Sequence, residues 1–169
     1  MSQIVNYIRQ HNLAKKGFKI LDLGGRDGIH SLPFIKDGCE VTIVDRKILA
    51  NKRKGLIKQK MDIRDFKYNG KYDLILINNV LPFLKGDEVL PFIENAHKHL
   101  KKGGVLEFTL FGVKHAWFWE PHIFFHDQSF IKALKKKYKV IFFKEEEGDK
   151  ITLVNDKVYW HNYELWIKK

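Results

Sequence analysis

A glycine-rich turn within residues 20–30 constrains the fold more than any other segment of this chain. An apolar run ends near Asp22, and Gly24, Gly25 and Gly28 place three glycines within five residues. A strand, a turn and a helix joined in this way bring backbone N–H groups and a helix N-terminus against a ligand. Glycine suits such a turn because it lacks a Cβ and adopts positive φ readily. The segment therefore predicts a ligand-binding turn at the end of a strand.

Length and composition predict one packed globular domain. The chain has 169 residues, of which 44% are hydrophobic and 14% aromatic, which is enough for a core. We expect a single domain over residues 1–169, with an N-terminal helix within 1–17 placed to act as a lid. Cys39 is the only cysteine, and the sequence shows neither a signal peptide nor an apolar run of membrane-spanning length. We therefore expect a cytoplasmic protein without membrane contact or a disulfide framework.

The charge balance is strongly basic. The formal net charge is +11, from 31 Lys and Arg against 20 Asp and Glu, and such a surface attracts anions, including nucleic acid. The lysines are scattered in short groups through expected turns and helix ends, without a long basic block. This pattern favours a solvated lysine-rich surface, and a nucleic-acid interface is the alternative.

Strand and helix patterns alternate along most of the chain, which indicates a parallel sheet with helices on both faces. The last two strands have no helix between them and should pair antiparallel. We therefore expect an α/β fold with a seven-stranded, mostly parallel sheet. Strands are expected at 18–23, 40–44, 56–61, 72–77, 105–111, 138–144 and 158–167, and helices at 2–16, 27–36, 47–52, 87–100 and 128–137.

Polar residues follow the expected strands on either side of the glycine turn. In an open α/β sheet, ligands bind beyond the carboxyl ends of the central strands. Asp45, with Arg46 after it, lies about 20 residues past the turn, where a carboxylate can accept from both ribose hydroxyls. Asp62 and Ile63 end the next strand, where Asp62 can accept from an adenine amino group. Asn78 follows the clearest buried strand. Asp45 favours ribose binding over a helix cap, whereas Asp62 and Asn78 suit a turn or cap equally well.

This order of motifs resembles that of class I S-adenosylmethionine-dependent methyltransferases, over roughly residues 18–167. Residues 21–28 stand where the family has D-x-G-x-G-x-G, and residues 44–45 and 61–63 stand at its ribose and adenine positions. Residues 72–84 and 102–106 are similar to its fourth motif and to the turn before its fifth strand. The resemblance implies a Rossmann-like methyltransferase fold and S-adenosylmethionine as cofactor. The cofactor-binding residues it implies are Asp22, Gly24, Gly25, Arg26, Gly28, Asp45, Arg46, Asp62, Ile63 and Asn78.

Arg26 departs from the family pattern, which usually has glycine near the methionine part of the cofactor. Its side chain can bind the cofactor carboxylate, point to solvent or fill the site, and the last case would leave a non-catalytic binding module. Within the family, residues 24–32 and 126–166 are most similar to small tellurite-resistance and thiopurine-type enzymes. That narrower likeness implies a small, soft, nucleophilic acceptor.

The segment 113–126 is rich in aromatic residues and histidines, and we expect it to form the acceptor side. Aromatic walls can hold a sulfonium-bearing ligand through cation–π attraction. His122 and His126 are candidates for a general base, although a hydrogen-bonded structural histidine is the commoner case. Their spacing suits a metal only on a helix, and Pro121 argues against one, so no metal site is expected.

Methyl transfer to a small molecule is therefore the main hypothesis. An NAD site is disfavoured, because the G-x-G-x-x-G fingerprint is missing and the last strands are antiparallel. Residues 79–83 do not match the motif of enzymes that methylate base amines. Other RNA-directed methyltransferases, and the non-catalytic module, are the alternatives.

Overall fold

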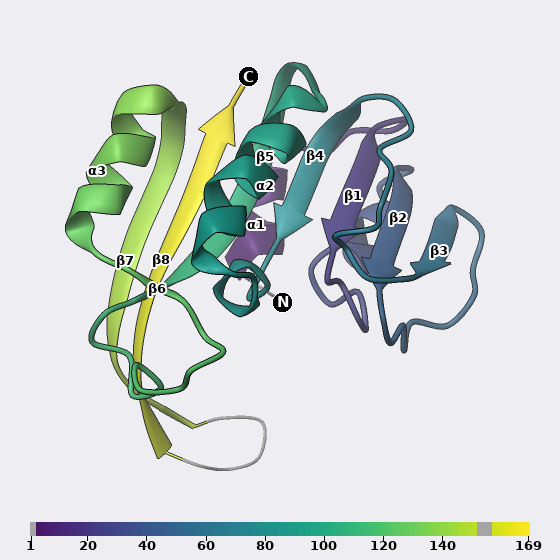
Figure 1. Cartoon of the computed structure of the whole chain (residues 1–169). Helices are drawn as coiled ribbons and strands as arrows, with labels where there is room; N and C mark the ends of the chain where they lie inside the picture. The colour runs from purple at the N-terminus through teal and green to yellow at the C-terminus, as the bar shows by residue number, and fades with distance from the viewer. Residues whose placement is uncertain (1–2, 152–156) are drawn as a thin grey trace.

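A mixed β-sheet runs through the computed structural model, which describes residues 3–151 and 157–169 (Figure 1). Seven strands follow the order β3-β2-β1-β4-β5-β8-β7, and β6 pairs with β5. The strands are β1 (Lys19–Leu23), β2 (Glu40–Asp45), β3 (Leu56–Lys60), β4 (Tyr72–Ile77), β5 (Leu100–Gly112), β6 (Phe125–His126), β7 (Lys139–Ile151) and β8 (Lys157–Lys168). The helices are α1 (Gln3–Gln10), α2 (Gly86–Lys98) and α3 (Gln128–Lys137), with 3-10 turns η1 (Leu32–Ile35) and η2 (Leu81–Phe83).

Strand directions confirm the expected fold class. The strands β3, β2, β1, β4 and β5 are parallel, and β8 is antiparallel to both β5 and β7. The count of seven strands is wrong by one, because β6 forms within the expected loop and makes the sheet eight-stranded. After β1 the chain passes to β2 and β3 on one side, and β4 then lies on the other side of β1. This reversal beside β1 is the topological switch point at which open α/β sheets bind ligands.

Helices cover both faces of the sheet (Figure 1). On one face α1 contributes Val5 and Ile8 to a core with Leu74 and Leu76, and on the other α2 and α3 pack over Ile75 and Ile77. The alternation follows from the two-residue period of a strand, and a strand covered on both faces is apolar throughout. No helix among residues 3–151 and 157–169 is long and apolar enough to cross a membrane.

Three of the expected helices are wrong or shorter. The helix expected at 27–36 is replaced by the 3-10 turn η1. Pro33 stands at the start of η1, and few residues separate Gly28 from the turn that precedes β2. The helix expected at 47–52 is absent, because the Leu49 N–H donates to the Arg26 carbonyl at 2.8 Å instead of bonding within a helix. The first helix ends at Gln10, and Asn12 follows with a φ of 54°, a left-handed conformation that stops a helix.

Two boundaries late in the chain also differ from expectation. The strand expected at 105–111 begins already at Leu100, so Gly103 and Gly104 of the expected turn lie inside β5. The strand expected at 138–144 continues as far as Ile151, which pairs with Lys157 of β8, and residues 152–156 lie outside the described residues. The resulting hairpin extends past the other strands at the lower end of Figure 1.

Gly104 gives a direct test of the β5 boundary. A Cβ added there would lie 3.0–3.1 Å from the backbone oxygens of Lys101, Asp73 and Tyr72. We expect Gly104→Ala to lower the free energy of unfolding by about 1–3 kcal/mol, because overpacking against backbone forces a shift. The measurement is urea denaturation.

Gly103→Asn is the matched control. Gly103 has a φ of 79° and its nearest contact is 4.0 Å away, and asparagine tolerates the left-handed region. We expect this variant to lose less than about 1 kcal/mol. Equal stabilities of the two variants would contradict the described path of β5.

Candidate functional site

A cavity of about 200 Å³ lies at the carboxyl ends of the parallel strands, at the switch point. It brings together residues that follow β1, β2, β3 and β4, which are far apart in the sequence. Half of the ten predicted cofactor residues line it, and the others do not. The lining residues are Gly24, Asp45, Arg46, Asp62, Ile63, Arg64, Asn79, Val80, Phe83 and Leu84.

The turn after β1 requires glycine, as the sequence predicts. Gly24 has a φ of 79°, and a Cβ there would overlap the Val80 side chain. A Cβ on Gly25 would overlap the Asp22 carboxylate, and Gly28 is buried with a φ of 74°. The absence of side chains therefore lets the backbone of this turn come close to neighbouring groups. The expected α-helix N-terminus does not follow it, so a helix dipole does not contribute here.

Arg26 lies on the outside of the turn. Its side chain is exposed and does not line the cavity, and its φ is 36°. Its backbone N–H donates to Asp45 Oδ2 at 3.2 Å. Of the three orientations considered for Arg26, the structure has the one that points to solvent.

Asp45 and Asp62 face the same cavity from the ends of neighbouring strands. Asp45 Oδ1 accepts from the Lys47 N–H at 2.8 Å, so backbone amides orient both of its oxygens. Arg64 donates to the two oxygens of Asp62, from Nε at 2.9 Å and Nη2 at 2.7 Å. The hydrogen bonds from Arg64 lower the pKa of Asp62 to about 2. Asp62 is therefore ionised at neutral pH, and each carboxylate retains lone pairs for a ligand.

The sequence model of a family described as a methyltransferase domain matches residues 1–138. The chain belongs to this methyltransferase domain family. This confirms the family resemblance that the strand-end motifs carry. No curated protein sequence matches the chain.

Solved methyltransferase structures share the fold. TehB from Haemophilus influenzae superposes with a TM-score of 0.74 and 18% identity over 98% of this chain, which spans 61% of TehB. The N-methyltransferase NodS from Bradyrhizobium japonicum WM9, in complex with S-adenosylhomocysteine, gives 0.69 and 16% over 97% of this chain and 85% of NodS. A 1,6-didemethyltoxoflavin-N1-methyltransferase from Burkholderia thailandensis, with that molecule and S-adenosylhomocysteine bound, gives 0.66 and 14% over 98% of this chain and 76% of the enzyme. At these identities the likeness shows the fold.

Two predicted site residues of the methyltransferase domain lie beside the cavity without lining it. Asp22 is 3% exposed and accepts from Ser31 Oγ at 2.5 Å. Burial raises the pKa of Asp22 to about 7. Asn78 follows β4, and its Nδ2 donates to Glu107 Oε1 at 3.0 Å. Asp22 thus packs against the glycine turn from the interior of the protein, and Asn78 links the end of β4 to β5.

Glu107 is a residue that the sequence analysis missed. It is 0% exposed in the middle of β5, and its Oε2 has no hydrogen-bond partner among the described residues. Burial, followed by the neighbouring charge of Glu164, raises the pKa of Glu107 to about 8. A glutamate within an apolar strand was the available signal. The cavity residues Arg64, Val80, Phe83 and Leu84 were also missed as site residues.

His122 and His126 lie in different surroundings. His122 is exposed and lines a second hollow of about 490 Å³ with Phe83 and Phe124, next to the start of α2. His126 is buried in β6, with its ring 4.3 Å from that of Phe130 of α3. Burial lowers the pKa of His126 to about 4. The two are not brought together as a metal pair, and a role for either as a base stays a prediction.

The aromatic segment after β5 packs on itself. The His115 ring lies 4.3 Å from Phe111 and 4.7 Å from Trp160. His115 is 1% exposed, and its Nδ1 accepts from the Trp117 N–H at 3.1 Å. Burial lowers the pKa of His115 to about 4, so its ring is neutral at pH 7. These rings form a packed cluster at the end of β5, and Trp119 is 87% exposed beyond it.

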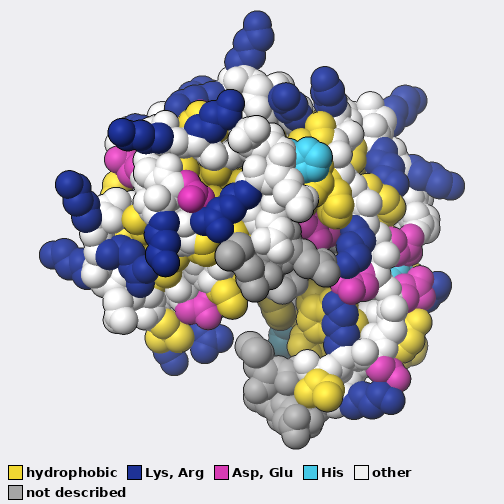
Figure 2. Space-filling model, turned by 180° about the vertical axis from the view of Figure 1, so that it is seen from behind, with side chains coloured by type: hydrophobic (Ala, Val, Ile, Leu, Met, Phe, Trp, Pro, Cys, Tyr) yellow, Lys and Arg dark blue, Asp and Glu magenta, His cyan; other side chains and the backbone are white. Residues whose placement is uncertain are grey.

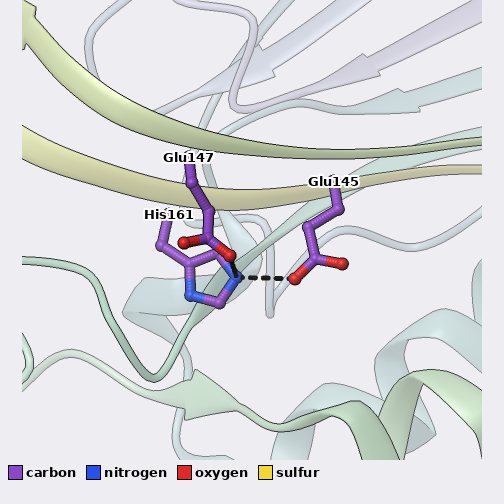
Figure 3. A group of neighbouring side chains, drawn as sticks. All are labelled: Glu145, Glu147 and His161. Carbon is purple, nitrogen blue, oxygen red and sulfur yellow. Dashed lines mark hydrogen bonds and ion pairs between the residues drawn. The ribbon is translucent and has the colours of Figure 1, made fainter.

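Glu145, Glu147 and His161 meet on the β7–β8 hairpin (Figure 3). His161 Nε2 lies 3.0 Å from Glu145 Oε1 and 3.8 Å from Glu147 Oε1. The Lys114 N–H donates to His161 Nδ1 at 3.1 Å, so Nδ1 is an acceptor and Nε2 carries a proton. Lys114 Nζ also bonds Glu147 at 2.9 Å. A lone pair on Nε2 is therefore not available to a metal ion, and the group ties the loop after β5 to the hairpin.

The rear face of the molecule carries Lys and Arg side chains scattered across most of its area (Figure 2). Asp and Glu side chains lie among them, so the positive charge does not form one band. At the cavity itself Asp62 is paired with Arg64. The RNA-directed alternative stays a prediction.

The buried acid of β5 predicts a dependence of stability on pH. The raised pKa of Glu107 means that the folded protein holds a proton up to about pH 8, whereas the unfolded chain releases it near the ordinary value of 4.5. Stability from this group is complete below pH 4.5 and is lost as pH rises toward 8. We expect the free energy of unfolding to fall by about 1 kcal/mol per pH unit near pH 7 through this group.

Glu107→Gln should flatten that slope. The comparison is urea denaturation of both proteins at pH 6.5, 7.5 and 8.5, with Asp22, whose pKa is also raised, left unchanged as a common background. Parallel slopes for the two proteins would show that Glu107 does not hold a proton in the folded state.

Proposed function

We propose that this chain transfers a methyl group from S-adenosylmethionine to a small-molecule acceptor. The observation that carries the proposal is the cavity where Gly24, Asp45 and Asp62 converge. A close backbone turn and two carboxyl groups at successive strand ends suit a nucleoside with a ribose diol. Membership of the methyltransferase domain family and the S-adenosylhomocysteine complexes of two structural neighbours support this choice of cofactor.

Each of the proposed residues would bind a different part of the cofactor. Asp45 would accept from the ribose hydroxyls, because its oxygens are already oriented by the Arg26 and Lys47 amides. Asp62 would accept from the adenine amino group. The adenine ring would lie against the apolar lining, to which Ile63, Val80 and Leu84 belong. Asn78 would lie at the methionine end.

Catalysis by this arrangement rests on alignment. The cofactor supplies a methyl group that its sulfonium has already activated for in-line displacement. The chain would hold donor and acceptor in line, with reacting atoms about 3–3.5 Å apart. A general base is needed only for an acceptor that must lose a proton. The cofactor cavity is therefore easier to recognise in this chain than any single catalytic side chain.

Calorimetry with S-adenosylmethionine and S-adenosylhomocysteine tests the cofactor assignment. We expect Asp45→Ala to weaken binding by about 1–3 kcal/mol, because a ribose hydroxyl loses its acceptor, which is roughly 5- to 150-fold in Kd. Asp149→Ala, which removes an acid from the distal hairpin, is the control for net charge. A folded wild-type protein that gives no heat and no thermal shift with either ligand would refute the proposal.

Arg26→Gly tests the alternative of a blocked site. The side chain is exposed and its φ of 36° is one that glycine adopts without strain. We expect the Kd for S-adenosylhomocysteine to change by less than about threefold, since no cavity contact is removed. An increase in affinity of tenfold or more would show that Arg26 obstructs the cavity.

A further inference from the structure

Lysines gather at the edge of the sheet that lies opposite to the cofactor cavity. The cavity is at the carboxyl ends of the parallel strands, whereas these lysines flank the amino ends of β1, β4 and β5 and the carboxyl end of the antiparallel β8. Figure 2 shows Lys and Arg side chains along the upper border of the molecule, where this edge lies. We call the following residues the lysine row: Lys15, Lys71, Lys98, Lys102, Lys168 and Lys169.

A cavity of about 280 Å³ opens between three members of the lysine row. Lys15, Lys102 and Lys168 line it, and no carboxylate among the described residues forms an ion pair with any of the three. Asp73 is the acid in this lining, and its carboxylate accepts from Lys101 Nζ at 2.7 Å. The cavity therefore presents ammonium groups whose charge is not compensated by the protein.

Two further members of the row lie against the same carbonyl group. Lys71 Nζ and Lys169 Nζ donate to the Lys98 carbonyl oxygen at 2.5 and 2.7 Å, so the two nitrogens are no further apart than the sum of these distances. Burial and the neighbouring charges of Lys71 and Lys98 lower the pKa of Lys169. Like charges this close repel each other. A bound anion would relieve the repulsion, so the arrangement favours an anionic ligand.

The acids near this edge do not cancel the charge of the row. Glu40 begins β2, which β1 separates from the strands of the row. Asp37 pairs with Arg9 at 3.0 Å. The carboxyl group of Lys169 accepts from the Gly103 N–H at 2.9 Å. Against six ammonium groups, these acids leave a clear excess of positive charge.

The length of the row suits a polymer better than a single small anion. Its members flank β1, β4, β5 and β8, which are neighbours in the sheet in this order. With about 4.8 Å between neighbouring strands, the row extends over about 15 Å. The rise per nucleotide along one strand of a duplex is about 3.4 Å, so several backbone phosphates can lie along it. Lysine ammonium groups contact such phosphates as point charges.

The edge lacks the apolar side chains that a membrane surface would require. None of the large exposed hydrophobic residues that the structure describes falls within residues 11–19, 69–73, 98–104 or 167–169. Insertion among lipid headgroups depends on buried apolar area as well as on charge. A nucleic-acid backbone, which is recognised mainly by charge, therefore fits this edge better than a lipid bilayer.

We propose that the lysine row binds the phosphate backbone of a nucleic acid without reading its bases. The six residues of β4 separate the row from the cofactor cavity by about 20 Å. A bound strand would therefore be held away from the methyl group, and the row anchors the protein instead of presenting a base for methylation. No residue that lines the cofactor cavity belongs to the row, so this binding does not depend on the proposed function.

Fluorescence anisotropy of the full chain with a labelled, mixed-sequence single-stranded RNA tests the proposal. The row variant combines Lys71→Gln, Lys102→Gln and Lys169→Gln. Three lost phosphate contacts should lower the slope of log affinity against log salt by about two, and the affinity in about 0.1 M salt by about 10- to 100-fold. An RNA of unrelated sequence should bind the wild type within about threefold of the first, because backbone contacts carry no sequence information.

A variant with Lys52→Gln, Lys67→Gln and Lys132→Gln is the matched control. These three side chains are exposed on other parts of the molecule, and the same charge is removed. We expect its RNA affinity to stay within about threefold of the wild type, because salt screens charges more than about 10 Å from the strand. Thermal midpoints equal to that of the wild type are expected for both variants, since all six replaced side chains are exposed. Equal losses of affinity in the two variants would show that binding follows net charge and would overturn the row as a site.

Three other results would also overturn the proposal. The first is a folded wild-type protein that does not bind RNA. The second is sedimentation with phosphatidylserine vesicles in place of RNA binding, which would assign the edge to a membrane. The third concerns saturating S-adenosylhomocysteine, which should leave the RNA affinity within about threefold because the two sites lie at opposite ends of β4. A change of tenfold or more would show that the strand reaches the cofactor cavity.

Discussion

The parallel pairing of β1 with β2 on one side and β4 on the other determines where the central part of the proposed binding site lies. Leu23 pairs with Val44, and Asp22 pairs with Leu76, so the segments that follow these strands emerge at one edge. The pairing brings Gly24 and Asp45 to one cavity, although about 20 residues separate them. A shift of one residue in either pairing would turn the strand-end side chains to the opposite face.

The local sequence was sufficient to predict a strand or helix where one residue pattern dominated the segment. The strand at Tyr72–Ile77 was predicted to the residue, because an aliphatic run between polar segments has few other structures. The helix Gln128–Lys137 was also predicted to the residue, and Asp127 caps it by accepting from the Ser129 and Phe130 amides. By contrast, the helix expected at 47–52 does not form, because the Leu49 N–H bonds to the Arg26 carbonyl instead. This bond joins residues far apart in the sequence, so the local pattern around Leu49 does not predict it.

The same limit applies to the candidate site. Asp45 and Asp62 could be found from the sequence because a strand end is a local feature. Val80 and Leu84 could not be assigned to the cavity, since their position depends on how η2 turns back over the strand ends. Glu107 was visible as an acid in an apolar strand, but its meaning depends on Asn78 and Asp22, which the sheet places around it. A site whose residues come from several strands can be recognised only when the register of the sheet is known.

The short turn η1, in place of a full helix after the glycine turn, has an electrostatic consequence. A helix at this point would direct the positive end of its dipole at the ligand and favour anions. Without it, the acceptor oxygens that face the switch point are those of Asp45 and Asp62, and Arg46 and Arg64 line the same cavity. The two carboxylates suit ligand hydroxyls and amino groups, which donate hydrogen bonds. On a chain with a net charge of +11, two acids and two arginines in one lining leave the cavity without the excess of positive charge that the whole chain carries.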